Sequence, residues 1–176
     1  MRKRHHRIVI TMHRIYLVGF MGAGKSTVGR ELSLKLRCPF VDLDSEIEKA
    51  EGMPVREIFE RFGEPRFRQI ESEHLRRISA APSSVIALGG GAYVDPENRT
   101  IVDDTGVAVW LDASFSAICE RVRPDGVRPL LADVEQARRL YAQRLPSYKL
   151  ARIHILTDNR LPEAIAQEIA ERLRTL

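Results

Sequence analysis

Five short apolar runs recur along the chain, and most are followed by a stretch in which apolar residues take helical spacing. The runs cover residues 14–18, 39–43, 84–88, 107–111 and 153–156. They have the length and the aliphatic content of strands buried on both faces. Alternation of such strands with helical segments is typical of a parallel sheet covered by helices on both sides, so the pattern predicts an α/β fold.

Helical patterns occupy much of the sequence between these runs. We expect a long helix from Lys25, helices over about 45–51, 54–62 and 65–79, one from Val134, and a C-terminal helix that opens at Pro162. Proline is tolerated at that opening position because the first N–H of a helix has no partner within the helix. Residues 122–128 carry turn-forming residues and little apolar content, which predicts a mobile loop.

The length and composition fit one globular domain. No apolar run in the 176 residues approaches the roughly 18 that a membrane span needs. Cys38 and Cys119 lie far apart in the sequence, as expected for free thiols in a reducing compartment. The basic N-terminus precedes an apolar run too short for a secretory signal. We therefore expect a cytoplasmic protein with a disordered basic extension over residues 1–12 and a single domain over 13–176.

The net charge of +4 suits either nucleic acid binding or the binding of ATP and an anionic substrate. The sequence shows no basic stripe interleaved with aromatic residues and no spacing of zinc ligands. A nucleic acid role is therefore the weaker interpretation.

A phosphate-binding motif follows the first predicted strand. Gly19-Phe-Met-Gly-Ala-Gly24-Lys25-Ser26 matches the P-loop pattern in full, between a strand and a helix as that pattern requires. Backbone N–H groups at the positive end of a helix bind phosphate oxygens, Lys25 is expected to reach the β- and γ-phosphates, and the Ser26 hydroxyl to bind Mg²⁺. The expected ATP-binding residues here are Gly22, Ala23, Gly24, Lys25, Ser26 and Thr27. The alternative, a glycine-rich turn that only connects strand to helix, does not explain the complete motif.

A P-loop does not determine the phosphoryl acceptor, but four further motifs narrow the choice. In chain order they are Phe40-Val-Asp-Leu-Asp44, Gly63-Glu-Pro-Arg-Phe-Arg-Gln-Ile-Glu71, Leu88-Gly-Gly-Gly-Ala92, and Arg128-Pro-Leu-Leu131 with Arg144-Leu-Pro-Ser-Tyr148. With these motifs the chain resembles the shikimate kinases from about His13 to its end. The resemblance implies a nucleoside-monophosphate-kinase-like fold with a five-stranded parallel sheet and a mobile lid near 122–133. It also implies transfer of phosphate from MgATP to the 3-hydroxyl of shikimate, a step toward chorismate and the aromatic amino acids.

Two carboxylates end the second predicted strand. In an extended segment over Phe40 to Asp44, Asp42 and Asp44 would project to the same side, at the strand end where open α/β sheets bind ligands. The resemblance implies that Asp42 helps to hold Mg²⁺ and that Asp44 contacts the substrate and acts in catalysis. The alternative role for Asp44 is a helix N-cap, although Ser45 and Glu48 already have the spacing of a capping box.

Two arginines are candidates for binding a carboxylate. Arg68 follows Phe67 in a predicted helix, where an ion pair with Glu71 is its alternative role. Arg144 flanks the apolar stripe of the helix from Val134, and a charge held there needs a partner. The resemblance assigns both guanidinium groups to the shikimate carboxylate, whose geometry they match. For Arg144, a structural ion pair is the alternative.

The remaining site residues also follow from the resemblance. Gly89, Gly90 and Gly91 lack side chains, which permits a close approach of backbone to the substrate; a plain tight turn is the alternative. Arg128 is expected in catalysis, bringing positive charge to the transferring phosphoryl group and ATP. Arg121 and Pro162 are expected on either side of the adenine, and Arg160 at a weaker nucleotide contact. Solvated surface charge is the alternative for the three arginines.

Other functions stay open at this point. The chain departs from the family after Arg144, because the segment from Pro146 to Ala151 is one residue shorter than usual and lacks a glutamate. A kinase of another small metabolite, such as gluconate, is one rival; a catalytically silent nucleotide-binding partner is another. We expect a monomer that binds shikimate and ATP, with neither a nucleic acid nor a membrane partner.

Overall fold

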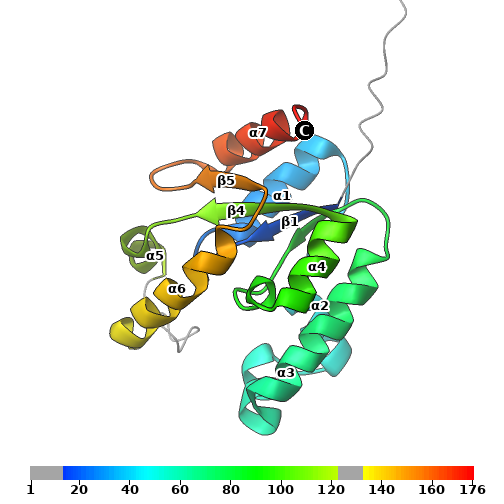
Figure 1. Ribbon diagram of the computed structural model, residues 1–176, viewed down its shortest axis with the longest axis vertical. Helices are drawn as coiled ribbons and strands as arrows, with labels where there is room; N and C mark the ends of the chain where they lie inside the picture. Colours follow the sequence, from blue (N-terminus) through cyan, green and yellow to red (C-terminus); the bar gives the residue numbers. More distant parts are fainter. Residues whose placement is uncertain (1–13, 123–132) are drawn as a thin grey trace, which may run out of the picture.

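The protein is built around one five-stranded parallel sheet. The computed structural model describes residues 14–122 and 133–176 (Figure 1). The strands are β1 (Arg14–Val18), β2 (Phe40–Asp42), β3 (Val85–Ala87), β4 (Gly106–Asp112) and β5 (Ile153–Leu156). Their order across the sheet is β2-β3-β1-β4-β5, and every neighbouring pair is parallel. The α/β class predicted from the sequence is confirmed.

Helices cover both faces of this sheet. Helices α1 (Lys25–Leu36) and α7 (Pro162–Leu173) pack against each other on one side (Figure 1). The opposite side carries α3 (Val55–Ser79), α4 (Pro96–Thr105) and α6 (Val134–Tyr148). The shorter elements are α2 (Leu43–Glu51), the 3₁₀ turn η1 (Ala92–Val94) and α5 (Phe115–Arg121).

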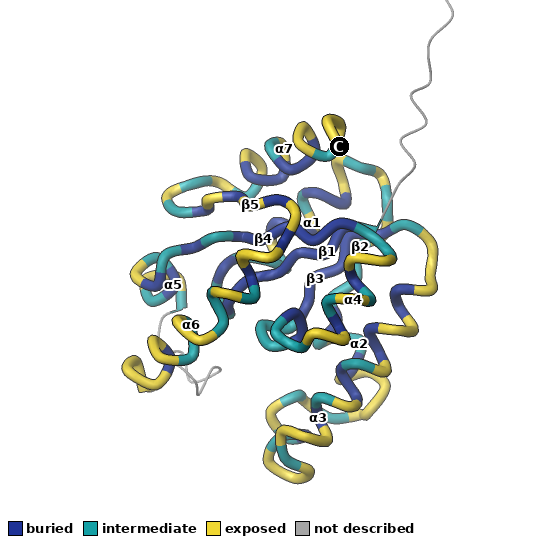
Figure 2. Tube along the Cα trace, in the orientation of Figure 1, coloured by how far each residue is buried: buried dark blue, intermediate teal, exposed yellow. Residues whose placement is uncertain are grey.

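The core lies between these layers. The strand residues Leu17, Ile86 and Val109 are fully buried, as is Leu32 on α1. Figure 2 shows the central strands buried and the outer sides of the helices exposed. Because the inner strands are covered on both faces, their side chains are apolar in both directions, which explains the continuous aliphatic runs in the sequence.

The elements largely follow the predictions, with specific differences. β1 and β5 occur at the predicted residues, and α1 and α7 begin at Lys25 and Pro162. The predicted helices over 54–62 and 65–79 both lie within α3, and the predicted break between them is confirmed, because the backbone at Gly63 is not helical, with φ of 78° and ψ of 167°. Two helices, α4 and α5, were not predicted. α4 begins at an Asp95 cap followed by proline, but it buries few apolar side chains, so it lacks a strong helical pattern.

Parallel topology places the carboxyl ends of all strands at one edge of the sheet. The order changes direction at β1, since β3 lies on one side of it and β4 on the other. Open α/β sheets bind ligands outside the strand ends at such a position. The segment that follows β1 is the predicted P-loop, and the segment that follows β3 is the triple glycine.

Candidate active site

The P-loop connects β1 to α1 as predicted. Gly22 and Gly24 have φ of 77° and 95°, values that glycine adopts without strain, and α1 begins at the next residue, Lys25. The Lys25 Nζ donates hydrogen bonds to Gly19 O at 2.8 Å and to Phe20 O at 2.9 Å. The lysine is therefore held over its own loop, at the positive end of a helix suited to phosphate.

Ser26 and Asp42 bring two oxygen ligands together between the P-loop and β2. The Ser26 hydroxyl donates to Asp42 Oδ2 at 2.6 Å. Oxygen donors suit Mg²⁺, which is usually held by one or two protein groups together with water and phosphate oxygens. In the described parts of the chain, no group of three or more acidic, histidine or cysteine side chains is arranged to hold a metal ion by itself. The residues present therefore fit a Mg²⁺ bound largely by nucleotide and water.

The structure corrects the prediction for Asp44. The strand β2 ends at Asp42, whose side chain caps α2 by accepting a hydrogen bond from Ser45 N at 3.4 Å. Asp44 therefore lies in the first turn of a helix, and its predicted position on an extended strand beside Asp42 is wrong. The predicted capping box is also wrong, because the helix starts before Ser45, and Glu48 accepts from Val55 N instead.

Asp44 nevertheless reaches the triple glycine. A Cβ on Gly89 would lie 2.8 Å from Asp44 Oδ1. Burial raises the pKa of Asp44, and the negative charge of Asp42 adds to the rise, while Lys25 opposes it. A carboxylate that is costly to keep ionised binds a proton more readily than an exposed one does.

The triple glycine is the point where the predicted acceptor residues meet. A Cβ on Gly90 would lie 3.2 Å from Arg144 Nη1. A Cβ on Gly91 would lie 2.5 Å from the Arg68 guanidinium nitrogens. The two arginines, which are 76 positions apart in the sequence numbering, therefore lie against consecutive residues of one turn. Glycine permits this approach, because a Cβ at either position would push against an arginine guanidinium.

Arg68 is held by acidic neighbours on its own helix. Its guanidinium forms ion pairs with Glu71 at 2.7 Å and with Glu64 at 2.9 Å. The ion pair with Glu71 that the sequence offered as an alternative role is therefore present. The side chain of Arg68 remains 27% exposed, so these pairs leave part of the guanidinium open to a ligand.

Arg144 differs from Arg68 in its partners. Its guanidinium lies over the Phe20 ring, 5.7 Å from the ring centre. It forms no ion pair with a carboxylate of the described residues, so the predicted alternative of a structural ion pair finds no partner there. A partly buried guanidinium without an acidic partner is suited to an anionic ligand.

Glu71, which the sequence predicts only as an ion-pair partner of Arg68, also faces the triple glycine. Its side chain is 1% exposed, and Oε1 has no hydrogen-bond partner among the described residues. A Cβ on Gly89 would lie 2.8 Å from this oxygen as well. Burial raises the pKa of Glu71, which Arg68 opposes. The available signal was the spacing Phe67-Arg68-x-x-Glu71, which places the carboxylate one helical turn after the arginine.

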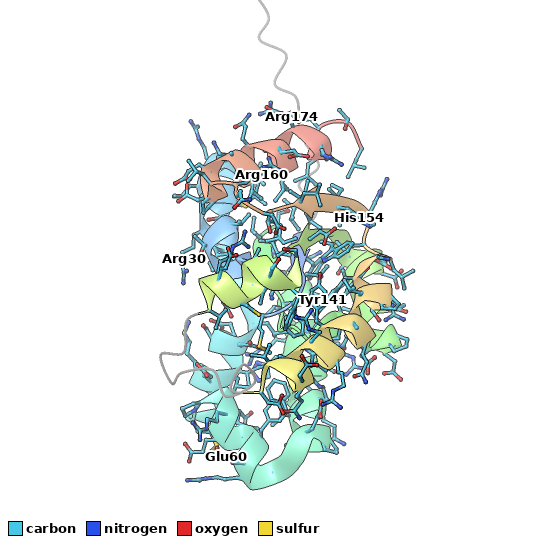
Figure 3. The ribbon with its side chains drawn as sticks, turned by 90° about the vertical axis from the view of Figure 1, so that its left-hand side faces the viewer. Arg30, Glu60, Tyr141, His154, Arg160 and Arg174 are labelled. Carbon is cyan, nitrogen blue, oxygen red and sulfur yellow. The ribbon has the colours of Figure 1, made fainter. Side chains whose placement is uncertain are left out.

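The residues predicted for the adenine end gather at the connection between β5 and α7. Arg121 donates to Thr157 O at 2.6 Å. Arg160, labelled in Figure 3, donates to Leu156 O at 2.8 Å and pairs with Glu168 at 2.7 Å. Arg121 is the last residue of α5, directly before the segment predicted as the mobile loop. Arg128 and most of the predicted lid lie outside the described residues.

Comparison with known proteins decides the family. The shikimate kinase family model matches residues 21–174. Shikimate kinase from Persephonella marina is 41% identical over 164 residues, covering 93% of this chain and 100% of the relative. The corresponding enzyme from a Sulfurihydrogenibium strain is 40% identical, again over 93% of this chain, and 99% of the relative. The chain belongs to the shikimate kinase family.

Solved structures agree with this assignment. Shikimate kinase from Acinetobacter baumannii, in complex with shikimate, has a TM-score of 0.89 at 36% identity and covers 94% of each chain. The Aquifex aeolicus shikimate kinase has a TM-score of 0.80 at 36% identity, over 92% of this chain and 96% of that one. An APS kinase from Mycobacterium tuberculosis, with a TM-score of 0.56 and 18% identity, shares the fold alone.

The predicted identity is therefore confirmed at the level of the enzyme. The chain is a kinase of the shikimate type, with a P-loop fold and with ATP and Mg²⁺ as the nucleotide and metal of the family. The rival interpretations, a gluconate-type kinase and a silent nucleotide-binding partner, are not favoured by these relatives. In the described part of the chain, no helix has the length and apolar character to cross a membrane.

Proposed function

We propose that this shikimate kinase transfers the γ-phosphoryl group of MgATP to the 3-hydroxyl of shikimate through the residues gathered around Gly89, Gly90 and Gly91. The observation that carries the proposal is the convergence of Arg68, Arg144 and Asp44 on this turn, beside the P-loop. Two cations beside a carboxylate suit an acceptor that carries both a carboxylate and hydroxyl groups.

The two arginines would bind the acceptor carboxylate. A planar guanidinium donates two parallel hydrogen bonds to a carboxylate, so two such groups fix both its position and its orientation. Arg144 forms no ion pair with a carboxylate of the described residues, and Arg68 brings a charge shared with Glu64 and Glu71. The backbone N–H of Gly90, with Gly89 and Gly91 beside it, would add a contact to the same acceptor.

Asp44 would orient the attacking hydroxyl and accept its proton. Burial raises the pKa of Asp44, so the carboxylate has a greater tendency to take a proton than an exposed aspartate. Positioning of the hydroxyl toward the γ-phosphorus and electrostatic stabilisation of the transferring group would together supply the catalysis, with no covalent enzyme intermediate.

The nucleotide side would use the P-loop and the end of β2. Gly22, Ala23, Gly24 and Thr27 would bind phosphate oxygens, and Lys25 would move from its loop carbonyls to the β- and γ-phosphates. Ser26 and Asp42 would hold Mg²⁺, Asp42 through water, and bound Mg²⁺ supplies positive charge to the phosphate oxygens.

Arg121 and Pro162 would enclose the adenine, with Arg160 at the edge of the nucleotide. Both arginines already donate to backbone carbonyls at the end of β5, which fixes their stems near that strand. Arg128, whose position is not described, stays a prediction for the residue that brings positive charge to the transferring group. We also propose that residues 13–176 work as one kinase domain, monomeric and cytoplasmic, on small-molecule ligands alone.

The direct test is an assay coupled to ADP release, run in parallel with shikimate, gluconate and nucleoside monophosphates as acceptors. We expect turnover with shikimate only, and formation of shikimate 3-phosphate as identified by NMR of the product. Turnover with gluconate or a nucleotide in its place would contradict the proposal. A protein that binds ATP but turns over none of the acceptors would support the silent partner instead.

A further inference from the structure

Tyr148 connects the end of α6 to the triple glycine. Its side chain is 1% exposed, and its hydroxyl donates a hydrogen bond to Gly90 O at 2.5 Å. Its ring packs against Trp110 of β4, with ring centres 6.3 Å apart. Contacts with the sheet therefore fix the ring, and the ring in turn fixes the direction of the hydroxyl.

The hydrogen bond to Gly90 O has a consequence for the next residue. A peptide unit is planar and trans, so the C=O of Gly90 and the N–H of Gly91 point in opposite directions. A bond that fixes the carbonyl of Gly90 therefore also fixes the N–H of Gly91, and it anchors Gly90, whose own N–H is the proposed contact with the acceptor. Gly90 lies between the two halves of the site, since a Cβ there would be 3.2 Å from Arg144 Nη1 and 3.5 Å from Met21 N of the P-loop.

Tyr148 also lies next to Arg144. The two residues are one helical turn apart on α6, which puts their side chains on the same face. Burial raises the pKa of Tyr148 to about 12, although the Arg144 charge opposes the rise. The phenol is therefore protonated at neutral pH and acts as a donor to Gly90, and its oxygen faces a cation.

We propose that Tyr148 is a positioning residue of the acceptor site, which holds the Gly90–Gly91 peptide and Arg144 in the arrangement that receives the acceptor carboxylate. The inference rests on the proposed function, because it assumes that this turn and Arg144 bind the acceptor. In this proposal, Tyr148 acts through Gly90 and Arg144 and does not itself contact the substrate. Its role is to hold the Gly90–Gly91 peptide of the loop and the Arg144 guanidinium of α6 at fixed positions relative to each other.

The test compares Tyr148→Phe with Tyr141→Phe. Tyr141, labelled in Figure 3, lies on the same helix and also donates one hydrogen bond to a backbone carbonyl, Ala113 O at 2.9 Å. Each variant loses one hydroxyl and keeps its ring, so the two are matched. We expect Tyr148→Phe to raise KM for shikimate about five- to tenfold, the effect of one lost hydrogen bond. KM for ATP and kcat should change less than twofold, and Tyr141→Phe should leave all three unchanged.

A binding measurement without turnover adds a second readout. Trp110 is the single tryptophan of the chain and packs against Tyr148, so its fluorescence provides a titration with shikimate. In Tyr148→Phe, the dissociation constant of shikimate should rise by the same factor as KM for shikimate. In Tyr141→Phe, it should stay unchanged. Circular dichroism and melting temperature, measured for both variants, identify any general loss of structure.

The outcomes separate this inference from the proposed function. Wild-type protein that does not phosphorylate shikimate would contradict the proposed function, whatever Tyr148→Phe does. Active wild-type protein with equal KM values in Tyr148→Phe and Tyr141→Phe would overturn the inference alone. A lower melting temperature in Tyr148→Phe without a change in KM or in the dissociation constant would show a purely structural role and would overturn it too.

Discussion

The carboxylate oxygens of Asp44 and Glu71 approach the same side of Gly89, since a Cβ at that glycine would lie 2.8 Å from one oxygen of each. One carboxylate comes from the first turn of α2, and the other from the middle of α3. Burial raises the pKa of both groups. Two acids in one confined place do not ionise as easily as two exposed ones, and this has consequences for activity and for stability.

The pH dependence of the reaction should reflect Asp44. If its carboxylate accepts the hydroxyl proton, activity falls as the pH drops through its raised pKa, which is above the ordinary value of 3.8. We expect the acid limb of kcat/KM for shikimate to lie above that value. Asp44→Asn should lose about 10²- to 10⁴-fold in kcat, the usual contribution of a general base. An acid limb at or below the ordinary value would contradict the assignment.

Stability should respond to Glu71 with a defined sign. Because its pKa is raised, the folded protein binds a proton at Glu71 more tightly than the unfolded chain does. The free energy of unfolding therefore falls as the pH rises from the ordinary value of 4.5 through the raised one. Urea unfolding across this range should favour Glu71→Gln increasingly over the wild type. A difference between the two proteins that stays constant with pH would contradict the raised pKa.

Arg144→Ala should weaken shikimate binding selectively. A lost charge-assisted hydrogen bond is worth about 1.5–3 kcal/mol, so KM for shikimate should rise about 10- to 100-fold. KM for ATP should stay within about twofold. Arg139→Ala is the matched control, because Arg139 lies on the same helix and its guanidinium donates to Glu135 O of that helix. Equal increases in both KM values for Arg144→Ala would indicate a structural role.

The pair formed by Ser26 and Asp42 predicts a change in the magnesium requirement. Ser26→Ala removes a hydroxyl that lies 2.6 Å from Asp42 Oδ2. We expect the Mg²⁺ concentration for half-maximal rate to rise several-fold, at fixed ATP. Ser26→Thr keeps the hydroxyl and should behave like the wild type. An unchanged Mg²⁺ dependence in Ser26→Ala would remove Ser26 from the metal site.

Two glycine substitutions should affect different properties, one the KM for shikimate and the other the melting temperature. A Cβ at Gly91 would lie 2.5 Å from the guanidinium at the far end of the Arg68 side chain, so Gly91→Ala should displace that guanidinium and raise KM for shikimate with little loss of stability. A Cβ at Gly106 would lie 2.1 Å from the backbone oxygen of Arg14, so Gly106→Ala should lower the melting temperature. The folded fraction of Gly106→Ala should keep a normal KM for shikimate. A normal KM in Gly91→Ala would argue that Arg68 does not bind the acceptor.

Local features of the chain were readable without the structure. The P-loop, the helix start at Lys25 and the strand over residues 14–18 follow from short-range rules, since each depends on residues that are adjacent in the sequence. The predicted end of β2 is wrong because the Asp42 side chain caps the following helix and so ends the strand at residue 42. Asp42 caps a helix two residues earlier than the pattern indicated, which moves Asp44 from a strand to a helix.

By itself, the sequence determined the class of the fold and the phosphate-binding loop, and its motifs led to the proposal that Asp44, Arg68 and Arg144 belong to the acceptor site. Only the tertiary structure decided how they meet: that Asp44, Glu71, Arg68 and Arg144 approach one turn, and that Tyr148 holds it. The physical reason is that strand and helix patterns are set by neighbours along the chain. Contacts between α2, α3, α6 and the end of β3 depend instead on packing between segments that are far apart in sequence.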